Sequence, residues 1–311
     1  MKKDSRIIVF NQDHLIGSGL ANILRHKGFK NTSFINAADC DFSDGKKLLK
    51  SFKKIKPEYC FLAPVREGGI LDNINSPGEL IYKNIIFEAN CLHAAFLSGV
   101  KKLVFFASSC VYPKDCPQPM KEEYLLTGPF EPTNEAYSVA KIAGIKMCQA
   151  YNKQYRTNFI SVIPATVFGP GDSFDLRNSH VVSALLRKFH EAKLSGFPEV
   201  KVWGSGKPRR EFVFIDDLAN TALFIMKNNT KFDVINLGTG KDHSIKELAL
   251  VIKEVVGFKG KIVFDKTKPD GVLRKLLDVS ISKRLWLKSN TKIDLQLKRT
   301  YEWFSENSCH K

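Results

Sequence analysis

Short apolar runs alternate with longer segments of helical periodicity through the first half of the chain. The runs cover residues 7–10, 59–63, 102–107 and 160–163, with an extended segment at 32–36, and the helical segments cover residues 16–27, 45–54, 80–98 and 136–155. Runs this short and apolar fit strands that are buried on both faces, so the alternation predicts a parallel sheet with helices on both sides. Such sheets bind ligands beyond the carboxyl ends of their strands, and we expect the functional residues there.

The pattern loosens beyond about residue 170. Strand-like segments at 200–203, 212–215, 234–237 and 261–264 lie between helical segments near 179–192, 218–227, 244–256 and 293–304. Ser244 is followed three residues later by Glu247, a capping box that marks the start of one of these helices. We expect one body with a cleft: a first domain of residues 1–170, whose sheet also receives later strands, and a smaller α/β part of residues 171–311.

The charge of the chain predicts an anionic partner. There are 48 Lys and Arg against 32 Asp and Glu, which gives a net charge of +16. The basic residues are spread over the whole length, without a block of about five or six and without zinc-ligand spacing. This distribution argues against a nucleic-acid partner and favours a small polyphosphate ligand, which a diffuse positive field would steer inward.

Cysteine usage and hydropathy predict the compartment. The seven cysteines are odd in number, scattered and free of any Cys-x-x-Cys pair, so we expect reduced thiols and neither disulfides nor a metal site. No stretch approaches the roughly 18 consecutive apolar residues of a membrane-spanning helix. The first apolar run is too short for a signal peptide, so we expect a cytoplasmic protein without a membrane partner.

Tyr137 and Lys141 form a Tyr-x-x-x-Lys pair inside a helical segment. Four residues make about one turn, so both side chains emerge on one face. A free Tyr hydroxyl titrates near about 10, and a neighbouring ammonium favours its phenolate form. Such a pair can act as a proton shuttle in carbonyl and alcohol chemistry. Many helices carry this spacing by chance, so the context of the pair has to decide.

That context is the strand at residues 102–107, which ends in Ser108-Ser109-Cys110. Ser, Tyr and Lys in this order and setting resemble the extended short-chain dehydrogenase/reductase superfamily. The resemblance implies a Rossmann-like, doubly wound α/β fold with a smaller C-terminal α/β substrate-binding part. It also implies that the Ser polarises the substrate oxygen, the Tyr transfers the proton, and the Lys holds the nicotinamide ribose.

Flanking segments are similar to the GDP-L-fucose synthase family over nearly the whole chain. They are residues 106–113 (FASSCVYP), 131–135 (EPTNE), 141–146 (KIAGIK), 178–181 (NSHV), 203–206 (WGSG), 210–212 (REF), 268–271 (KPDG) and 274–278 (RKLLD). The resemblance implies an NADPH-dependent 3,5-epimerase and 4-reductase that acts on GDP-4-keto-6-deoxy-D-mannose.

The same resemblance implies the roles of individual residues. Cys110 is the expected base and His180 the expected acid of epimerisation, while Ser108, Tyr137 and Lys141 serve the reduction. A thiolate can remove a proton alpha to a ketone if the enolate is stabilised. The expected substrate contacts are Lys188, Trp203, Arg210 and Asp270. The expected cofactor contacts are Asn11, Gly17, Ala63, Ala107, Ser108, Tyr137, Lys141, Pro164, Val167 and His180.

The first strand-to-helix turn departs from the family. Three glycines at spacing G-x-x-G-x-x-G are expected, but the chain carries Asn11, His14 and Gly17 at these positions, with Asp13 alongside. Asn tolerates a left-handed backbone, whereas a side chain at His14 obstructs the approach of a pyrophosphate. Asn36 stands roughly where an Arg would meet the phosphate of NADPH, and Thr166 replaces an Asn. We therefore expect weaker NADPH binding than in the relatives, with NADH as an open alternative.

Two further readings stay open. Relatives that make GDP-L-colitose or reduce GDP-heptoses share these motifs, although Cys110 together with His180 favours a substrate that is epimerised first. A non-catalytic GDP-sugar-binding paralogue with a decayed dinucleotide loop would explain the turn but not the intact catalytic set. Family members are commonly homodimers built from two long helices, which here correspond to residues 80–98 and 136–155.

Overall fold

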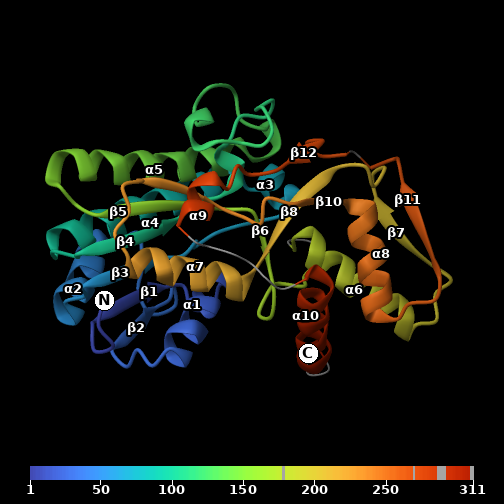
Figure 1. Cartoon of the computed structure of the whole chain (residues 1–311), viewed down its shortest axis with the longest axis horizontal. Coiled ribbons are helices and arrows are strands. Elements are labelled where there is room, and N and C mark those ends of the chain that lie inside the picture. The colour runs from blue at the N-terminus through green and yellow to red at the C-terminus, as the bar shows by residue number, and fades with distance from the viewer. Residues whose placement is uncertain (177–178, 269, 286–291, 309–311) are drawn as a thin grey trace.

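The structure is a computed structural model that describes residues 1–176, 179–268, 270–285 and 292–308. Its centre is a six-stranded parallel sheet whose strands are almost completely buried in the middle (Figure 1). In spatial order the strands are β2 (Thr32–Ile35), β1 (Ile7–Phe10), β3 (Tyr59–Leu62), β4 (Lys102–Phe106), β5 (Phe159–Pro164) and β9 (Val234–Leu237). The predicted parallel sheet is thereby confirmed.

Helices cover both faces of this sheet. On one side α4 (Pro77–Leu97) packs between α2 (Gly45–Ile55) and α5 (Glu135–Tyr155), and on the other α1 (Leu15–His26) packs against α7 (Ile215–Lys227) (Figure 1). A helix on each side shields the apolar side chains that alternate along the strands, which is the doubly wound arrangement predicted from the sequence.

A second apolar core lies beyond the carboxyl ends of the central strands. Here β8 (Arg209–Phe214) pairs with β6 (Thr166–Phe168), β10 (Asp242–Ser244) and β12 (Arg274–Lys275), while β7 (Glu199–Trp203) pairs with β11 (Lys261–Asp265). The helices of this part are α6 (Val181–Leu194), α8 (Ile245–Val256) and α10 (Ile293–Ser308). The predicted capping box is confirmed, because Ser244 and Glu247 bond reciprocally at the start of α8.

Some elements differ from the sequence prediction. Helix α7 begins at Ile215 rather than 218, and Ile215 fits against Gly19 and Gly169, where an added Cβ would lie 2.4 Å from its side chain. The hydrophobic pattern of the sequence did not indicate the strands β6, β10 and β12 or the helices α3 (Ile70–Asn75) and α9 (Ser280–Arg284). Each of these elements is short, with six residues or fewer. Their bounds follow from tertiary contacts, which a periodicity of hydrophobic residues does not encode.

The strand order puts a topological switch point between β1 and β3, which we call the crevice. Strand β2 lies on one side of β1 and β3 on the other, so the connections after β1 and β3 diverge at the carboxyl edge. Open α/β sheets bind ligands at such a switch point. The two strand ends are tied together there, because Nδ2 of Asn11 donates a hydrogen bond to the carbonyl oxygen of Ala63 at 3.2 Å.

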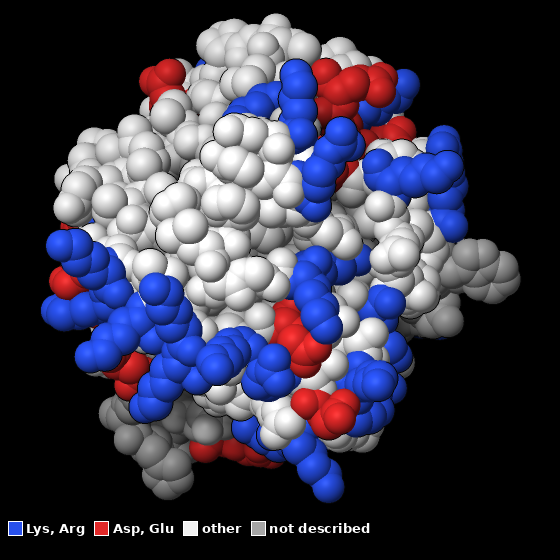
Figure 2. All heavy atoms as spheres, turned by 90° about the vertical axis from the view of Figure 1, so that its left-hand side faces the viewer, with Lys and Arg blue, Asp and Glu red and all other residues white. Residues whose placement is uncertain are grey.

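Much of the positive charge gathers at the opposite end of the molecule. Figure 2 shows this end, where α2 and α4 finish, with Lys and Arg side chains massed beside a broad uncharged area. The residues that line a cavity of about 550 Å³ there include the basic Arg6, Lys53, Lys56 and Lys101 and the acidic Glu58. This part of the charge therefore lies far from the crevice.

Within the described residues, no helix is both long and apolar enough to cross a membrane.

Candidate active site

The turn between β1 and α1 forms without its first two glycines. Asn11 takes a left-handed backbone with φ of 55°, a conformation that Asn adopts more readily than most residues. Gly17 is required in the first turn of α1, because a Cβ there would lie 1.9 Å from the carbonyl oxygen of Asn11. His14 precedes α1, and its Nδ1 accepts a hydrogen bond from the backbone N–H of Ile16 at 3.2 Å. An imidazole thus caps the end of the helix that would face an anion.

Tyr137 and Lys141 lie one turn apart on α5, as their spacing predicts. The Lys141 ammonium donates to Oε1 of Glu88 at 2.8 Å and to the carbonyl oxygen of Phe106 at 3.3 Å. It lies 5.7 Å from the centre of the Tyr137 ring. Burial raises the pKa of Glu88 to about 7, although Lys141 opposes that rise. The positive charge of Lys141 is therefore partly neutralised inside the protein.

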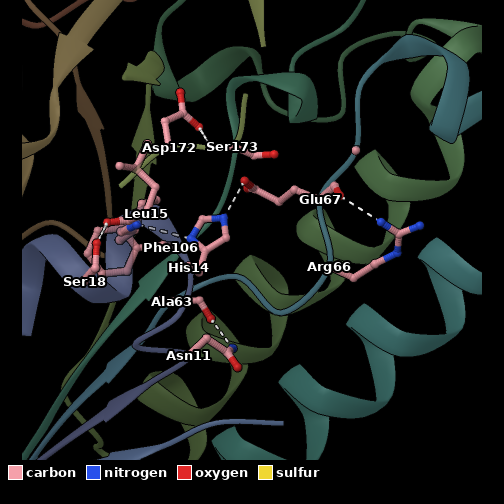
Figure 3. A network of polar contacts seen from close by, with 12 residues as sticks. Asn11, His14, Leu15, Ser18, Ala63, Arg66, Glu67, Phe106, Asp172 and Ser173 are labelled. Atoms are coloured by element: carbon pink, nitrogen blue, oxygen red, sulfur yellow. Dashed lines mark hydrogen bonds and ion pairs between the residues drawn. The ribbon is translucent and has the colours of Figure 1, made fainter. Parts of the chain in front are cut away.

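The Tyr137 hydroxyl donates to Oε1 of Glu67 at 2.8 Å, and Oε2 of Glu67 contacts Nε2 of His14 at 2.9 Å. Figure 3 shows His14 and Glu67 pointing toward each other from the loops that follow β1 and β3. Burial and the Glu67 carboxylate raise the pKa of Tyr137 well above its ordinary value. We expected Lys141 to lower the pKa of Tyr137, but burial and Glu67 together outweigh that effect. Burial also acts to raise the pKa of Glu67, but His14, His180 and Lys141 hold it well below its usual range.

Ser108 and Cys110 follow β4 in a short 3₁₀ turn, η1 (Ser109–Val111). The backbone N–H of Cys110 donates to Oγ of Ser108 at 3.4 Å. Nδ2 of Asn134 approaches the Cys110 sulfur at 3.3 Å, and the buried Ser138 hydroxyl donates to the Cys110 carbonyl at 2.9 Å. These contacts hold the thiol in place beside Tyr137, with which it interacts electrostatically.

His180 comes from the second part of the chain, at the N-terminal end of α6. Its charge lowers the pKa of Glu67 and of Asp172, although burial raises the pKa of Asp172 above its ordinary value overall. The hydroxyl of Ser183 donates to Asp172. His180 and Cys110 thus come from different parts of the fold, and His180 interacts electrostatically with Glu67 while Cys110 does so with Tyr137.

The predicted substrate residues form two groups. Arg210, on β8, is half-buried, and this burial lowers its pKa, while its attraction to Cys110 and Asp270 acts in the opposite direction. Asp270 accepts hydrogen bonds from the backbone N–H of Ser205 at 2.8 Å and from its hydroxyl at 2.6 Å. Lys188 belongs to the second group: its ammonium lies 5.1 Å from the centre of the half-exposed Trp203 ring. Arg210 is the predicted residue whose charge connects the substrate part with the catalytic part.

The remaining predicted cofactor residues lie along the carboxyl edge of the sheet. Ala63 and Ala107 directly follow β3 and β4, Pro164 ends β5, and Val167 lies in β6. Asn178 and Pro269, which belong to two of the sequence motifs, are outside the described residues.

Sequence reasoning missed Glu67, Glu88 and Asn134. The signal for Glu67 was present, because a carboxylate followed by two glycines stands four residues after a predicted strand. Glu88 carried no signal, since an acidic residue on an amphipathic helix is usually solvated. The structure instead places it at 1% exposure against Lys141. Asn134 lies inside the EPTNE motif, but nothing in the sequence linked it to the Cys110 sulfur.

Comparison with known proteins shows the family of the chain. The NAD dependent epimerase/dehydratase family matches residues 12–238. A GDP-L-fucose synthase of Sinorhizobium fredii is 45% identical over 91% of this chain and 94% of its own length. A GDP-6-OMe-4-keto-L-xylo-heptose reductase from C. jejuni superposes with a TM-score of 0.93 at 36% identity, over 98% of this chain and 99% of that one. A GDP-L-fucose synthetase from Naegleria fowleri bound to NADP has a TM-score of 0.93 at 31% identity, over 100% of this chain and 95% of that one. The chain belongs to the NAD dependent epimerase/dehydratase family.

Proposed function

We propose that the chain converts GDP-4-keto-6-deoxy-D-mannose into GDP-L-fucose, by epimerisation at C3 and C5 and NADPH-dependent reduction at C4. One observation carries this proposal. The Tyr137 hydroxyl donates a hydrogen bond to Oε1 of Glu67 at 2.8 Å, Cys110 interacts electrostatically with Tyr137, and His180 does so with Glu67. A proton shuttle, a thiol and an imidazole therefore surround one place. The similarity to curated GDP-L-fucose synthases supports the same activity.

The turn after β1 fits a dinucleotide. Asn11 supplies the left-handed backbone, Gly17 lets the helix start close to the strand, and α1 presents its N-terminus to the crevice. Asn11, Gly17, Ala63, Ala107, Pro164 and Val167 would line NADPH, with Ser108, Tyr137, Lys141 and His180 near its reactive end. When bound, NADPH supplies the hydride for C4. The His14 side chain takes up space near that helix N-terminus, so we propose weaker binding than in the relatives.

For epimerisation, Cys110 is the base and His180 the acid. The Cys110 thiolate removes the proton alpha to the ketone, and Arg210, which attracts that thiolate, keeps a positive charge nearby. Asn134 donates to the sulfur and fixes its direction. His180 returns a proton on the other face, which inverts the carbon.

For reduction, Tyr137 gives its proton to the oxygen at C4. Ser108 lies at the end of β4 and donates a hydrogen bond to the same oxygen, which stabilises the charge that develops there. Lys141, whose charge Glu88 partly neutralises, would reach the ribose of the cofactor.

The GDP part would lie between the two parts of the chain. Arg210 suits a diphosphate because its planar fork can bind two oxygens at once. Lys188, Trp203 and Asp270 complete the substrate contacts. In this proposal residues 1–170 mainly hold the cofactor and residues 171–311 mainly hold the nucleotide sugar, apart from α7 and β9, which pack with the first part.

A related GDP-4-keto sugar is the second candidate. The high TM-score to a GDP-heptose reductase and 36% identity to a GDP-L-colitose synthase of Yersinia pseudotuberculosis favour it. The presence of Cys110, whose thiolate would attract Arg210, together with His180 favours a substrate that is epimerised before it is reduced.

Deuterium exchange tests the epimerisation without any reduction. The protein is incubated in heavy water with GDP-4-keto-6-deoxy-D-mannose and without NADPH, and exchange at C3 and C5 is followed by NMR. We expect exchange with the wild type and with Cys40→Ala, whose thiol is remote, and none with Cys110→Ala. Equal exchange in Cys110→Ala would rule out the thiol as the base.

We also propose a cytoplasmic homodimer that pairs through α4 and α5. Large apolar side chains of these helices are exposed: Tyr82 at 61%, Leu97 at 50% and Tyr155 at 43%. The described cysteines are all free thiols, which fits a reducing compartment. Light scattering should give the mass of two chains, and Tyr82→Glu should shift it toward one. A monomer in the wild type would contradict the proposal.

A further inference from the structure

Glu67 bridges Tyr137 and His14 across the crevice. Its two carboxylate oxygens are used separately, Oε1 by the Tyr137 hydroxyl at 2.8 Å and Oε2 by His14 at 2.9 Å. Among the described residues, Glu67 is the hydrogen-bond partner of that hydroxyl. Glu67 lies outside the motifs from which the site residues were predicted, so the structure alone reveals this contact.

The contacts of His14 define where its proton lies. Nδ1 accepts the backbone N–H of Ile16, so it carries no hydrogen, and the hydrogen of the neutral ring is on Nε2. Nε2 therefore donates to Glu67. The result is a row of hydrogen bonds in which His14 donates to one oxygen of Glu67 and Tyr137 donates to the other.

Tyr137 needs such a chain because it is cut off from water. The residue is 5% exposed. Lys141, its charged neighbour on α5, is 1% exposed and already donates to Glu88 and to Phe106. The side chains of Glu67 and His14, in contrast, are each 23% exposed. The polar path from the Tyr137 hydroxyl to solvent thus runs through Glu67 and His14.

We propose that Glu67 returns a proton to Tyr137 after each reduction and that His14 connects Glu67 to solvent. The inference rests on the proposed role of Tyr137 as proton donor. When C4 is reduced, the O–H bond of Tyr137 breaks and an O–H bond forms on the sugar, which leaves a tyrosinate. Glu67 takes a proton from solvent, either directly or through His14. In the second route Nδ1 of His14 gives up its contact with Ile16 and takes a proton from solvent, and Nε2 passes its own proton to Glu67, which leaves a neutral ring. The carboxyl group of Glu67 then rotates and delivers the proton to the tyrosinate. The carboxylate is restored, and Tyr137 again donates to it as observed.

The charges around Glu67 suit this cycle. His180 and Lys141 keep the resting group ionised and His14 donates a hydrogen bond to it, so it accepts the Tyr137 hydrogen rather than competing for it. A tyrosinate 2.8 Å away would place two negative charges side by side. That repulsion raises the proton affinity of the pair, and the proton taken up passes to the stronger base, the tyrosinate.

Single and multiple turnovers separate proton return from every other role of Glu67. The first turnover uses the proton that Tyr137 already carries, whereas every later one requires its replacement. With a GDP-4-keto sugar that the wild type reduces, NADPH oxidation is followed in a stopped-flow instrument, first with enzyme in excess and then with substrate in excess. Activity of the wild type tests the proposed function. Comparison of the wild type with Glu67→Gln tests the return of the proton through Glu67, which we call the relay.

We expect Glu67→Gln to complete its first turnover at nearly the wild-type rate. It should then show a burst of one NADPH per site and a steady phase slower by about tenfold or more, because general acid–base groups contribute at least that much. Added imidazole should accelerate the slow phase, and heavy water should slow it. His14→Gln, which keeps hydrogen bonds but cannot carry a proton, should show a weaker form of the same effect. Glu79→Gln, on the surface of α4, is the matched control and should behave as the wild type.

Three outcomes would overturn the relay. Equal slowing of first and later turnovers would assign Glu67 an orienting role alone. Faster turnover in Glu67→Gln would make the carboxylate a brake on Tyr137, and an unchanged steady phase would place the proton path elsewhere. The contact itself has a check without substrate: ultraviolet titration of the free protein should show a lower Tyr137 pKa in Glu67→Gln than in the wild type.

Discussion

The ammonium of Lys141 lies 2.8 Å from Oε1 of Glu88, and both side chains are almost completely buried. The other oxygen of Glu88 has no hydrogen-bond partner among the described residues and faces Gly144, where an added Cβ would approach it to 2.6 Å. A residue proposed for catalysis is thus held by a carboxylate that is itself only half satisfied, and the pair links α4 to α5 behind the active site.

The stability of the protein should depend on pH through Glu88. Burial raises its folded pKa from 4.5 to about 7, so the folded state holds an extra proton between these values. The contribution of Glu88 to the unfolding free energy is therefore complete below about pH 4.5 and is lost as pH rises through about 7. Glu88→Gln resembles the protonated form. Its unfolding free energy relative to that of the wild type should therefore rise with pH, by on the order of 1 kcal/mol per pH unit in this window.

Urea denaturation of both proteins at several pH values measures this difference. Glu79→Gln is the control, because its exposed carboxylate has a pKa lowered by Lys83 and should add no slope above about pH 5. If the wild type instead became more stable relative to Glu88→Gln as pH rises, attraction to Lys141 would outweigh the cost of burying the carboxylate.

Gly17→Ala should destabilise the protein. The new Cβ would lie 1.9 Å from the carbonyl oxygen of Asn11, and a backbone atom cannot move aside cheaply. We expect a loss of about 3 kcal/mol in unfolding free energy, in the upper range for overpacking. Gly78→Ala, where nothing lies within 4 Å of the added Cβ, should gain about 0.5 kcal/mol from helix propensity. Urea titration compares the two, and equal stabilities would contradict the tight turn.

His14→Gly should tighten NADPH binding. The change removes the imidazole from the N-terminus of α1 and restores a residue that permits close approach of a pyrophosphate. An anion at a helix N-terminus gains about 1 kcal/mol, so we expect a dissociation constant about fivefold lower by calorimetry. Asn22→Gly, on the exposed side of α1, should not tighten binding. Unchanged or weaker NADPH affinity in His14→Gly would mean that the imidazole does not obstruct the cofactor.

Arg210→Lys should weaken GDP binding. Lysine keeps the charge but loses the planar pair of donors, so we expect a dissociation constant about tenfold higher. Arg209→Lys is the matched control, because Arg209 is already paired with Asp242 at 2.9 Å and Glu247 at 3.4 Å. Calorimetric titration with GDP separates the two variants. The same affinity in both would remove Arg210 from the diphosphate site.

Much of the fold follows from the sequence because its strands and long helices carry their own signals. The run at β4 is fully buried, and the pattern at α8 includes a capping box, so both were predictable from local residues. The positions of Tyr137, Lys141 and Cys110 follow from motif and topology together.

The neighbours of those residues were not predictable. Glu67 meets Tyr137 across 70 residues and Glu88 meets Lys141 across 53, and no local pattern encodes such pairs. The sequence indicated that His14 would disturb the turn. It could not indicate that the imidazole would bond to Glu67, because that depends on how the loop after β3 folds back across the crevice.

Identification of the product tests the central claim most directly. Purified protein is incubated in heavy water with GDP-4-keto-6-deoxy-D-mannose and NADPH, and the sugar product is analysed by NMR. The account predicts GDP-L-fucose that carries deuterium at C3 and C5 and the NADPH hydrogen at C4. A reduced sugar that keeps the substrate's configuration at C3 and C5 would contradict the epimerase role, and unchanged NADPH would contradict the reductase.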